Sequence, residues 1–410
     1  MSTFSPPTPP SRAPTYDEQR FKTITSPCEW VEDYHPGGYH PVHIGDVFKN
    51  GQYKVIRKLG EGSYSTVWLA SDLRYNQYIA LKILVSEISR FTADLRILRH
   101  IAEVALREAS QHVTRLLGDF EHLGPNGIHK VLVLEPMGAS VNNMVEELPQ
   151  FKPRRQEMIV AIRLIWQRSL QALEFLHDNG VSHGDFQPGN LLFTLDDIES
   201  KPKDVLRQAE DVQARSISPP VERLDGKQDK WAPRYLCIAQ PLEQFTHYTE
   251  GFNIKLSDMG GDPPSNPVIP VGLRAPELIL TGGVDRTLDV SNFGCLVFEL
   301  ITGQPLFCVP GSNFEDDDHL LLLTARIGAL PEELFLHWKS SSLYFTADRK
   351  RFNCQLGSVG DGEEPLTTIE ELFDQAGLDL TEEDACNYDP TKRPSPAELL
   401  LDPWFREIDI

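Results

Sequence analysis

Four polar side chains in this sequence have the types and the spacing that phosphate chemistry requires. Lys82 lies in the alternating segment IALKI, where an ammonium group on a strand can reach nucleotide phosphates. Asp185 and Asn190 stand five residues apart in one loop, so a carboxylate that could accept a hydroxyl proton lies near an amide that could hold a metal ion. Asp258 ends the segment IKLSD and suits a Mg²⁺ ion that bridges two phosphates.

A glycine-rich turn precedes Lys82 and could close over the same phosphates. It is formed by Leu59, Gly60, Glu61, Gly62, Ser63, Tyr64, Ser65, Thr66 and Val67. Small residues there let backbone N–H groups approach phosphate oxygens. Because Ser65 stands where a third glycine is usual, the turn taken alone favours an ordinary hairpin.

The segment Arg274, Ala275, Pro276 and Glu277 follows Asp258 and completes a set of five features. Each feature by itself is compatible with a purely structural role. Their order along one chain, at compatible spacing, favours a catalytic site that uses a nucleotide.

The elements that must position these residues divide the chain into a strand-rich and a helix-rich part. From Tyr53, three alternating and β-branched segments predict successive antiparallel strands. A helix is predicted near residues 93–105, and two further strands are predicted before Glu135.

Helices are predicted to dominate beyond Glu135. The segment 158–177 places apolar residues on one face, and the segment 291–301 is apolar on nearly every side. The first of these faces consists of Ile162, Ile165, Leu173 and Leu176. Residues 196–250 and 311–384 lack sustained periodicity and are expected to be irregular.

Composition excludes several classes of protein. The 39 basic and 60 acidic residues give a net charge of −21, which repels nucleic acid and favours basic partners, although solubility explains such a charge equally well. No apolar run is long enough to predict a membrane-spanning helix, and the first residues lack the apolar core of a secretory signal. The six cysteines form no CxxC pair, so we expect neither a zinc site nor disulfides, and a cytoplasmic or nuclear location.

Beyond these patterns, residues from about Tyr53 to Phe405 resemble the protein kinase superfamily. The leader from Glu32 to Asp46, running into the strand at Tyr53, is similar to that of the SR-protein kinase family, as is the insert before Asp258. The resemblance implies an α+β, two-lobed protein kinase fold. It has a small antiparallel β-sheet N-lobe with one helix and a larger, mainly helical C-lobe.

The expected boundaries follow from this resemblance and from composition. Residues 1–27 are rich in Pro, Ser and Thr and are expected to be a disordered tail, followed by a family-type extension at 28–52. The kinase domain is expected at 53–406, with the N-lobe at about 53–137 and the C-lobe at about 138–406. An inserted loop is expected at about 196–250.

The resemblance also assigns residues to the site. It implies catalytic roles for Asp185, Lys82, Asn190 and Gln187, with Asn190 and Asp258 as Mg²⁺ ligands. The residues implied to bind ATP, beside Lys82 and Asp258, are Leu59, Gly60, Glu61, Gly62, Ser63, Val67, Ala80, Leu192, the gatekeeper Leu134, and the hinge from Glu135 to Met137. Structural roles are implied for Asp94 as the partner of Lys82, for Asp289 beneath the catalytic loop, and for the pair Glu277 and Arg393. The four polar side chains are expected to converge in a cleft between the lobes.

The sequence departs from the family pattern at several positions. Asp94 is one methylene shorter than the usual Glu, so the helix that carries it must move inward to reach Lys82. Gly184 replaces the arginine that anchors a phosphorylated activation loop, so we expect no such switch. Gln187 replaces a lysine and Pro270 a threonine at the acceptor site, which predicts reduced turnover. The segment 381–388 lacks the helix that kinases ordinarily place before Asp389.

The implied activity is that of an ATP- and Mg²⁺-dependent protein serine/threonine kinase, acting as a monomer without nucleic-acid or membrane partners. Its expected substrates are serines in basic, Arg/Ser-containing protein segments. Residues 361–384 contain ten acidic residues and no Lys or Arg, and 315–318 add a further acidic run. In the family, an acidic groove in this region holds the substrate; a solvated acidic loop is the equal alternative.

Two other functions remain open from the sequence. The departures at Asp94 and Gln187 are also compatible with a pseudokinase that binds nucleotide or a partner without efficient catalysis. The run His183, Gly184 and Asp185 is similar to that of kinases acting on small molecules such as aminoglycosides or choline. Arg274 to Glu277 and the family leader disfavour the second function.

Overall fold

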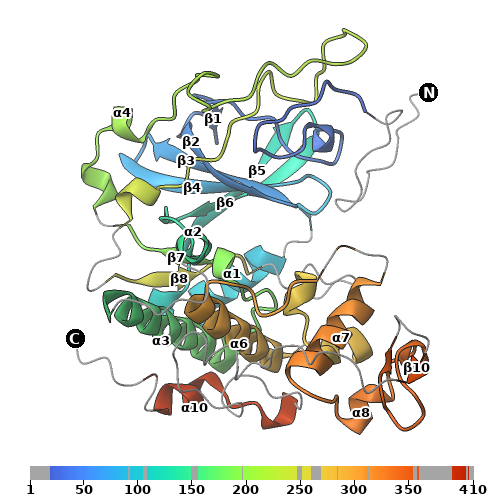
Figure 1. Cartoon of the computed structure of the whole chain (residues 1–410). Helices are drawn as coiled ribbons and strands as arrows, with labels where there is room; N and C mark the ends of the chain where they lie inside the picture. Colours follow the sequence, from blue (N-terminus) through green and yellow to red (C-terminus); the bar gives the residue numbers. More distant parts are fainter. Residues whose placement is uncertain are drawn as a thin grey trace. The chain divides into compact units, whose positions relative to one another are not determined.

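The structure is a computed structural model of the whole chain. It describes residues 19–90, 93–104, 109–148, 156–195, 197–246, 252–259, 269–283, 285–309, 311, 314–353, 358–359, 390–402 and 405. The chain forms two compact units, coloured along the sequence in Figure 1. The first contains Met1–Glu103, Thr114–Ala139 and Phe193–His247, and the second contains Val104–Val113, Ser140–Leu192 and Tyr248–Ile410.

The first unit is built on one antiparallel sheet with the strand order β1-β2-β3-β4-β6-β5. Its strands are β1 (Val47–Phe48), β2 (Tyr53–Gly62), β3 (Ser65–Asp72), β4 (Gln77–Leu84), β5 (Leu116–Gly124) and β6 (Gly127–Leu134). Helix α1 (Ala93–Val104) lies between β4 and β5 in the chain. The three strands predicted from Tyr53, the helix and the two later strands are therefore confirmed.

Alternating apolar residues explain this sheet. Val55, Trp68, Ile79, Leu81 and Val131 are almost completely buried and belong to one core cluster. β-Branched and aromatic side chains favour extended backbone because they pack well on a pleated surface. The two-residue strand β1 had no periodic signal in the sequence and was not predicted.

The N-terminal segment belongs to the first unit from Gln19 onward. Phe21 is only 2% exposed and forms an isolated β-bridge with Arg223 of the insert. The composition predicted a disordered tail over residues 1–27. Residues 19–27 do not belong to such a tail. A segment rich in Pro, Ser and Thr has too few apolar side chains to form a core of its own. Phe21 is instead buried in a cluster that includes apolar side chains about two hundred residues away in the chain.

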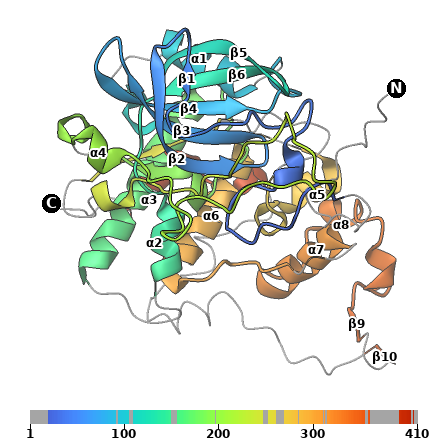
Figure 2. The ribbon, with the colours of Figure 1, turned by 90° about the horizontal axis from the view of Figure 1, so that it is seen from above.

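The insert is largely irregular, as predicted, but it packs on the first unit rather than forming part of the second. It contains the short helix α4 (Lys203–Leu206). Its backbone runs beside β2, since Gln208 N donates to Ile56 O and Gln240 N donates to Lys58 O, both at 2.9 Å. Figure 2 shows the insert, coloured yellow-green, alongside β2 and the blue N-terminal segment.

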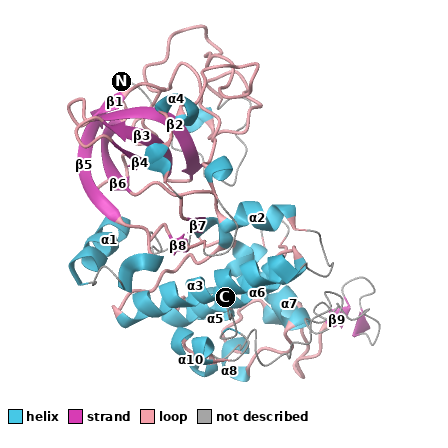
Figure 3. Cartoon of the chain, turned by 90° about the vertical axis from the view of Figure 1, so that its left-hand side faces the viewer, coloured by secondary structure: helices cyan, strands magenta, loops and turns pink. Residues whose placement is uncertain are grey.

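The second unit is mainly helical (Figure 3). Its elements are α2 (Val141–Glu147), α3 (Gln156–Asp178), β7 (Leu191–Phe193), β8 (Ile254–Leu256), α5 (Pro276–Thr281), α6 (Arg286–Thr302), α7 (Glu315–Arg326), α8 (Glu332–Phe335), β9 (Phe352–Asn353), β10 (Ser358–Val359) and α10 (Pro396–Leu401). The short strands β7 and β8 pair with each other, as do β9 and β10. Phe193, the last residue of β7, falls within the first unit.

Two long helices form the core of the second unit. The four apolar residues predicted on one face of α3 are all buried, and α6 is buried along most of its length. Asp285 caps α6 by accepting a hydrogen bond from Thr287 N, and Gly303, with φ of 74°, ends it in the left-handed conformation. Both predicted helices are confirmed.

Helix α7 contradicts the prediction that residues 311–384 are irregular, within the part that the structure describes. Its sequence EDDDHLLLLTAR places four leucines in succession, which hides the helical period. The four acidic residues of its first turn favour a helix N-terminus because they lie near the positive end of the helix dipole. Among the described residues, no helix is long and apolar enough to cross a membrane.

Candidate active site

Lys82 lies in the middle of β4 and forms an ion pair with Asp94 on α1. Lys82 Nζ and Asp94 Oδ2 are 2.7 Å apart, and their side chains are only 10% and 9% exposed. Asp94 is the second residue of α1, so the first turn of the helix carries the carboxylate to the strand. The shorter acid therefore reaches the lysine within the first unit.

The glycine-rich segment forms the hairpin between β2 and β3. Gly62 pairs with Ser65, which leaves Ser63 and Tyr64 as the turn, and bulges interrupt the register along β2. A Cβ atom added to Gly60 or Gly62 would meet no atom within 4 Å. The described residues thus leave space above the hairpin that a phosphate group could fill.

Three of the residues implied to bind ATP lie on adjacent strands of the first unit. Ala80 on β4 pairs in register with Leu134 on β6, and Val67 on β3 pairs with Lys82. Ala80 and Leu134 are buried, whereas Val67 is partly exposed. Leu59 is also partly exposed and packs against the cluster that contains Ile56 and Leu69.

Glu135 and Met137, which are also implied to bind ATP, lie near the end of the segment Thr114–Ala139 of the first unit. Glu135 N donates to Arg115 O at 3.2 Å, and Glu135 Oε1 accepts from Arg115 N at 2.8 Å. Met137 is buried. Leu192 belongs to the second unit, where it forms an isolated β-bridge with Ser140.

Asp185 is the centre of a hydrogen-bond network in the second unit. Its Oδ1 accepts a hydrogen bond from Gln187 Nε2 at 2.8 Å, and its Oδ2 accepts one from Asn190 Nδ2 at 3.0 Å. Burial raises the pKa of the Asp185 carboxyl; His183 and the two amides oppose this rise, and the negative charge of Asp258 adds to it. Asp185, Gln187 and Asn190 are therefore assembled around one carboxylate, with Asp258 within electrostatic range.

The residue before Asp258 is joined to the catalytic loop by two hydrogen bonds. Ser257 N donates to Asn190 O at 2.8 Å, and His183 Nε2 lies 2.9 Å from Ser257 O. Asp185 N donates to His183 Nδ1, so the neutral tautomer with hydrogen on Nε2 satisfies both contacts. Asp258 itself has φ of 60°, a left-handed conformation that costs energy for a residue with a Cβ atom.

Asp289 on α6 supports the catalytic loop from below. Its Oδ2 accepts from His183 N and its Oδ1 from Gly184 N, both at 2.8 Å, and His177 Nε2 lies 2.9 Å from Oδ2. Asp289 is fully buried, so its charge is satisfied by these contacts. Sequence reasoning did not identify His177 or the backbone of Ser257, because neither carries a spacing signal.

Glu277 on α5 and Arg393 form a bidentate ion pair. Arg393 Nη1 contacts Glu277 Oε1, and Nη2 lies 3.0 Å from Oε2. The arginine side chain is 4% exposed and the glutamate 11%. The pair joins two segments 116 residues apart in the chain and fixes the start of α5.

The donor set of the second unit fits a magnesium ion held partly by substrate. Among the described residues, no three His, Cys, Asp or Glu side chains are arranged to hold a metal ion by themselves. Mg²⁺ is commonly held by one or two protein oxygen ligands together with phosphates. Asn190 uses its amide nitrogen to contact Asp185, so its amide oxygen is the atom that could bind a metal ion.

Some predicted features lie outside the residues that the structure describes. They are the acidic stretch 361–384 and the segment 381–388 that was expected to lack a helix. Pro270 is described and precedes a 3₁₀ turn at Val271–Leu273. The acidic run at 315–318 forms the first turn of α7, where Asp316 pairs with Arg274 at 2.7 Å.

Comparison with known proteins shows that the two units together have the fold of a protein kinase domain. The sequence profile described as the protein kinase domain matches residues 53–204. The crystal structure of a kinase domain aligns with a TM-score of 0.60 at 23% sequence identity, covering 90% of this chain and 98% of that chain. The predicted two-lobed protein kinase fold is therefore confirmed.

Curated relatives point to one branch of that fold. The serine/threonine-protein kinase SRPK of Physarum polycephalum is 29% identical, over 93% of this chain and 92% of that protein. Protein kinase dsk1 of Schizosaccharomyces pombe is 26% identical over 93% of this chain and 85% of its own length. Human SRSF protein kinase 3 is 34% identical over 40% of this chain and 29% of that protein. We conclude that the chain contains a protein kinase domain and that its curated relatives over most of its length are kinases of the SR-protein kinase family.

Proposed function

We propose that this kinase uses Mg²⁺ and ATP to phosphorylate serines in basic, Arg/Ser-containing protein segments. The network around Asp185 carries this proposal, because a carboxylate oriented by two amides and placed near a second carboxylate is the arrangement that phosphoryl transfer to a hydroxyl needs. The convergence of Lys82 with Asp185 on one nucleotide remains a prediction of the proposal.

In the proposed reaction, a serine hydroxyl of the substrate attacks the γ-phosphorus of ATP. An oxygen–phosphorus bond forms to serine, the bond to the β–γ bridging oxygen breaks, and ADP leaves. Asp185 accepts the hydroxyl proton, while Gln187 and Asn190 hold its carboxylate in position. Lys82, paired with Asp94, would contact the α- and β-phosphates. Asp258 and Asn190 would hold Mg²⁺, which would supply positive charge to neutralise the phosphates.

The preference for basic substrates is supported by charge and by the relatives. The net charge of −21 attracts arginine-rich segments over a distance and speeds their association. A relative's name, SRSF protein kinase 3, indicates a kinase of SRSF proteins. Not every acid of α7 is available for binding, because Asp316 pairs with Arg274 and Asp317 accepts from Trp338, Ser340 and Tyr344.

The test is phosphate transfer by the purified full-length chain with Mg-ATP on three peptide arrays, Arg/Ser, Gly/Ser and Glu/Ser. We expect kcat/KM to be about tenfold or more higher for the Arg/Ser peptides, which corresponds to about 1.4 kcal/mol. Asp185→Ala should abolish transfer, whereas Asp178→Ala, a matched change of an exposed aspartate on α3, should not.

Each outcome separates the alternatives. A preference for neutral or acidic peptides contradicts the proposed substrate class. Equal turnover by the Asp185→Ala variant contradicts the catalytic assignment. ATP binding without any transfer to protein supports the pseudokinase alternative, and transfer to a small alcohol supports the small-molecule alternative.

A further inference from the structure

The tip of the glycine-rich hairpin is held by contacts from outside the hairpin. Tyr39, in the leader, donates its hydroxyl hydrogen to Gly62 O at 2.6 Å. Val85 N, just after β4, donates to Tyr64 O at 2.9 Å. Tyr39 is only 5% exposed and packs in the core cluster that contains Phe21 and Leu236, so its hydroxyl has a fixed position.

A buried charge cluster joins the leader, taken from here on as residues 29–46, to the same hairpin. Lys58 Nζ contacts the carboxylate of Glu29 in the leader and lies 3.0 Å from Glu61 Oε2 in the hairpin. The side chain of Lys58 is 0% exposed and that of Glu29 is 2% exposed. Burial opposes the charge of Lys58, but the two carboxylates outweigh this effect and raise its pKa. One ammonium therefore holds an acid of the leader and an acid of the glycine-rich hairpin together.

The backbone around Lys58 is fixed by the insert. Lys58 N donates to Gln208 Oε1 at 2.9 Å, Lys58 O accepts from Gln240 N, and Nζ also donates to Cys237 O at 3.0 Å. The lysine thus has no freedom to leave Glu29 without breaking contacts on both sides.

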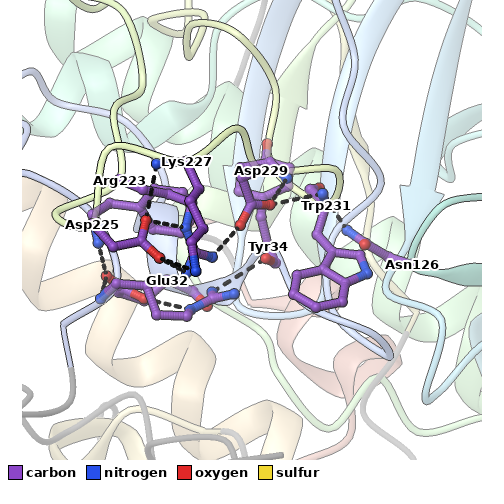
Figure 4. A network of polar contacts seen from close by, with 11 residues as sticks. Glu32, Tyr34, Asn126, Arg223, Asp225, Lys227, Asp229 and Trp231 are labelled. Carbon is purple, nitrogen blue, oxygen red and sulfur yellow. Dashed lines mark hydrogen bonds and ion pairs between the residues drawn. The ribbon is translucent and has the colours of Figure 1, made fainter. Parts of the chain in front are cut away.

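The leader is in turn joined to the insert through Asn126 of the β5–β6 turn, whose contact with Trp231 is drawn in Figure 4. Asn126 Nδ2 donates to Tyr39 O and, at 2.9 Å, to Trp231 O. Arg223 of the insert forms ion pairs with Asp225 and Asp229, and Asp229 accepts from Trp231 N at 2.7 Å. The leader is therefore joined through Asn126 to a part of the insert that is itself held by internal ion pairs.

We propose that the leader positions the glycine-rich hairpin for nucleotide binding, with Tyr39 and Glu29 as positioning residues. The inference rests on the proposed function, since it assumes that the hairpin covers ATP phosphates. A glycine-rich turn that is already held in place loses less conformational freedom when it binds a ligand. Loss of either support should therefore weaken ATP binding while leaving the chemistry at Asp185 unchanged.

The matched pair Tyr39→Phe and Tyr78→Phe tests this role. Both remove one phenol hydroxyl that donates to a backbone carbonyl in the first unit, Gly62 O for Tyr39 and Lys201 O for Tyr78. Only the first contacts the hairpin tip. We expect Tyr39→Phe to raise both the Kd and the KM for ATP about fivefold, which is the change in an equilibrium constant that the loss of one hydrogen bond typically causes. We expect kcat to be unchanged. Tyr78→Phe should leave both constants unchanged, and the two variants should have similar melting temperatures.

A second variant removes the other support, and its melting temperature is measured as well because it changes a buried ion pair. Glu29→Gln keeps hydrogen-bonding atoms next to Lys58 and Tyr34 but removes the charge, so we again expect a weaker Kd for ATP at unchanged kcat. If both variants fold and bind ATP as tightly as the original chain, the leader does not position the hairpin. That outcome contradicts this inference alone. If the original chain binds no ATP, the proposed function is wrong as well.

Discussion

At the scale of single residues, Asp94 shows how a departure from the family pattern is accommodated. Its carboxylate is one methylene shorter than glutamate, yet Oδ2 lies 2.7 Å from Lys82 Nζ. The other oxygen, Oδ1, is buried and has no hydrogen-bond partner among the residues that the structure describes. A pair that is nine-tenths buried cannot replace a lost charge with water, so each member depends strongly on the other.

We therefore predict that Asp94→Asn lowers the free energy of unfolding by about 3–5 kcal/mol, the usual cost of breaking a buried pair. Urea denaturation measures this change, and KM for ATP should rise in parallel. The matched control is Glu222→Gln, which breaks an ion pair with Lys22 whose side chains are 54% and 63% exposed. That change should cost less than about 1 kcal/mol. Equal effects of the two substitutions would contradict the buried pair's role.

Gly184 illustrates a departure with a local physical reason. Its φ is 77°, in the left-handed region where residues with a Cβ atom are strained. Its N–H group donates to Asp289 Oδ1, so the loop geometry around Asp185 depends on this conformation. The absence of the usual arginine is thus compatible with an ordered catalytic loop.

At the scale of elements, three histidines join the leader to the β5–β6 hairpin. His40 in the leader lies 4.6 Å from His122 of β5 and 4.9 Å from His129 of β6, measured between ring centroids. Burial, followed by the neighbouring His129 and His122, lowers the pKa of His40 to about 3, while Asp46 opposes this shift and His43 adds to it. Burial also lowers the pKa of His122 and His129. The contact therefore requires neutral imidazoles.

This lowered pKa predicts acid sensitivity of the first unit. The unfolded chain binds a proton at His40 below about pH 6.5, whereas the folded chain does so only near pH 3, so stability is lost as the pH falls between these values. From pH 7.5 to 5, His40 alone should lower the free energy of unfolding by about 2 kcal/mol.

The measurement is the free energy of unfolding of the full chain in urea at the two pH values. His40→Phe, which keeps an aromatic ring beside Phe48, should reduce the loss between them. The control His35→Phe changes a partly exposed histidine of the same leader and should preserve the loss. An undiminished pH dependence in the His40→Phe variant would rule out His40 as its source.

At the scale of the whole molecule, the charge of −21 affects any charged substrate. Long-range attraction raises the encounter rate with basic segments and is screened by salt over about 10 Å at 0.1 M ionic strength. This effect depends on the summed charge rather than on any one acidic side chain, several of which are already paired.

We predict that raising NaCl from about 0.05 to about 0.3 M increases KM for an Arg/Ser peptide about fivefold or more. KM for a Gly/Ser peptide and KM for ATP provide the controls and should change little over the same range. Steady-state kinetics at fixed Mg-ATP measure all three. A salt-independent KM for the Arg/Ser peptide would show that charge does not select the substrate.

The sequence by itself determined the strands of the first unit from Tyr53 onward, the helix near Asp94 and the two long helices, and it indicated which residues could carry out phosphate chemistry. Strands from Tyr53, the helix near Asp94 and the long buried helices followed from hydrophobic period, because that period reflects which side of each element is buried. Lys82, Asp185, Asn190 and Asp258 were recognisable because their residue types and spacing serve phosphate chemistry. The roles of Asp289 and Arg393 came from the family resemblance, since no spacing along the chain connects them to their partners.

Only the tertiary structure decided which distant residues meet. With 60 acids and 39 bases, nothing in the sequence selects Glu29 as the partner of Lys58, and nothing places the insert beside β2. Phe21 appeared to belong to a tail and proved to be core, and the leucine run hid helix α7. The physical reason is that pairing and burial depend on packing among segments far apart in the chain, whereas period and motif depend on near neighbours.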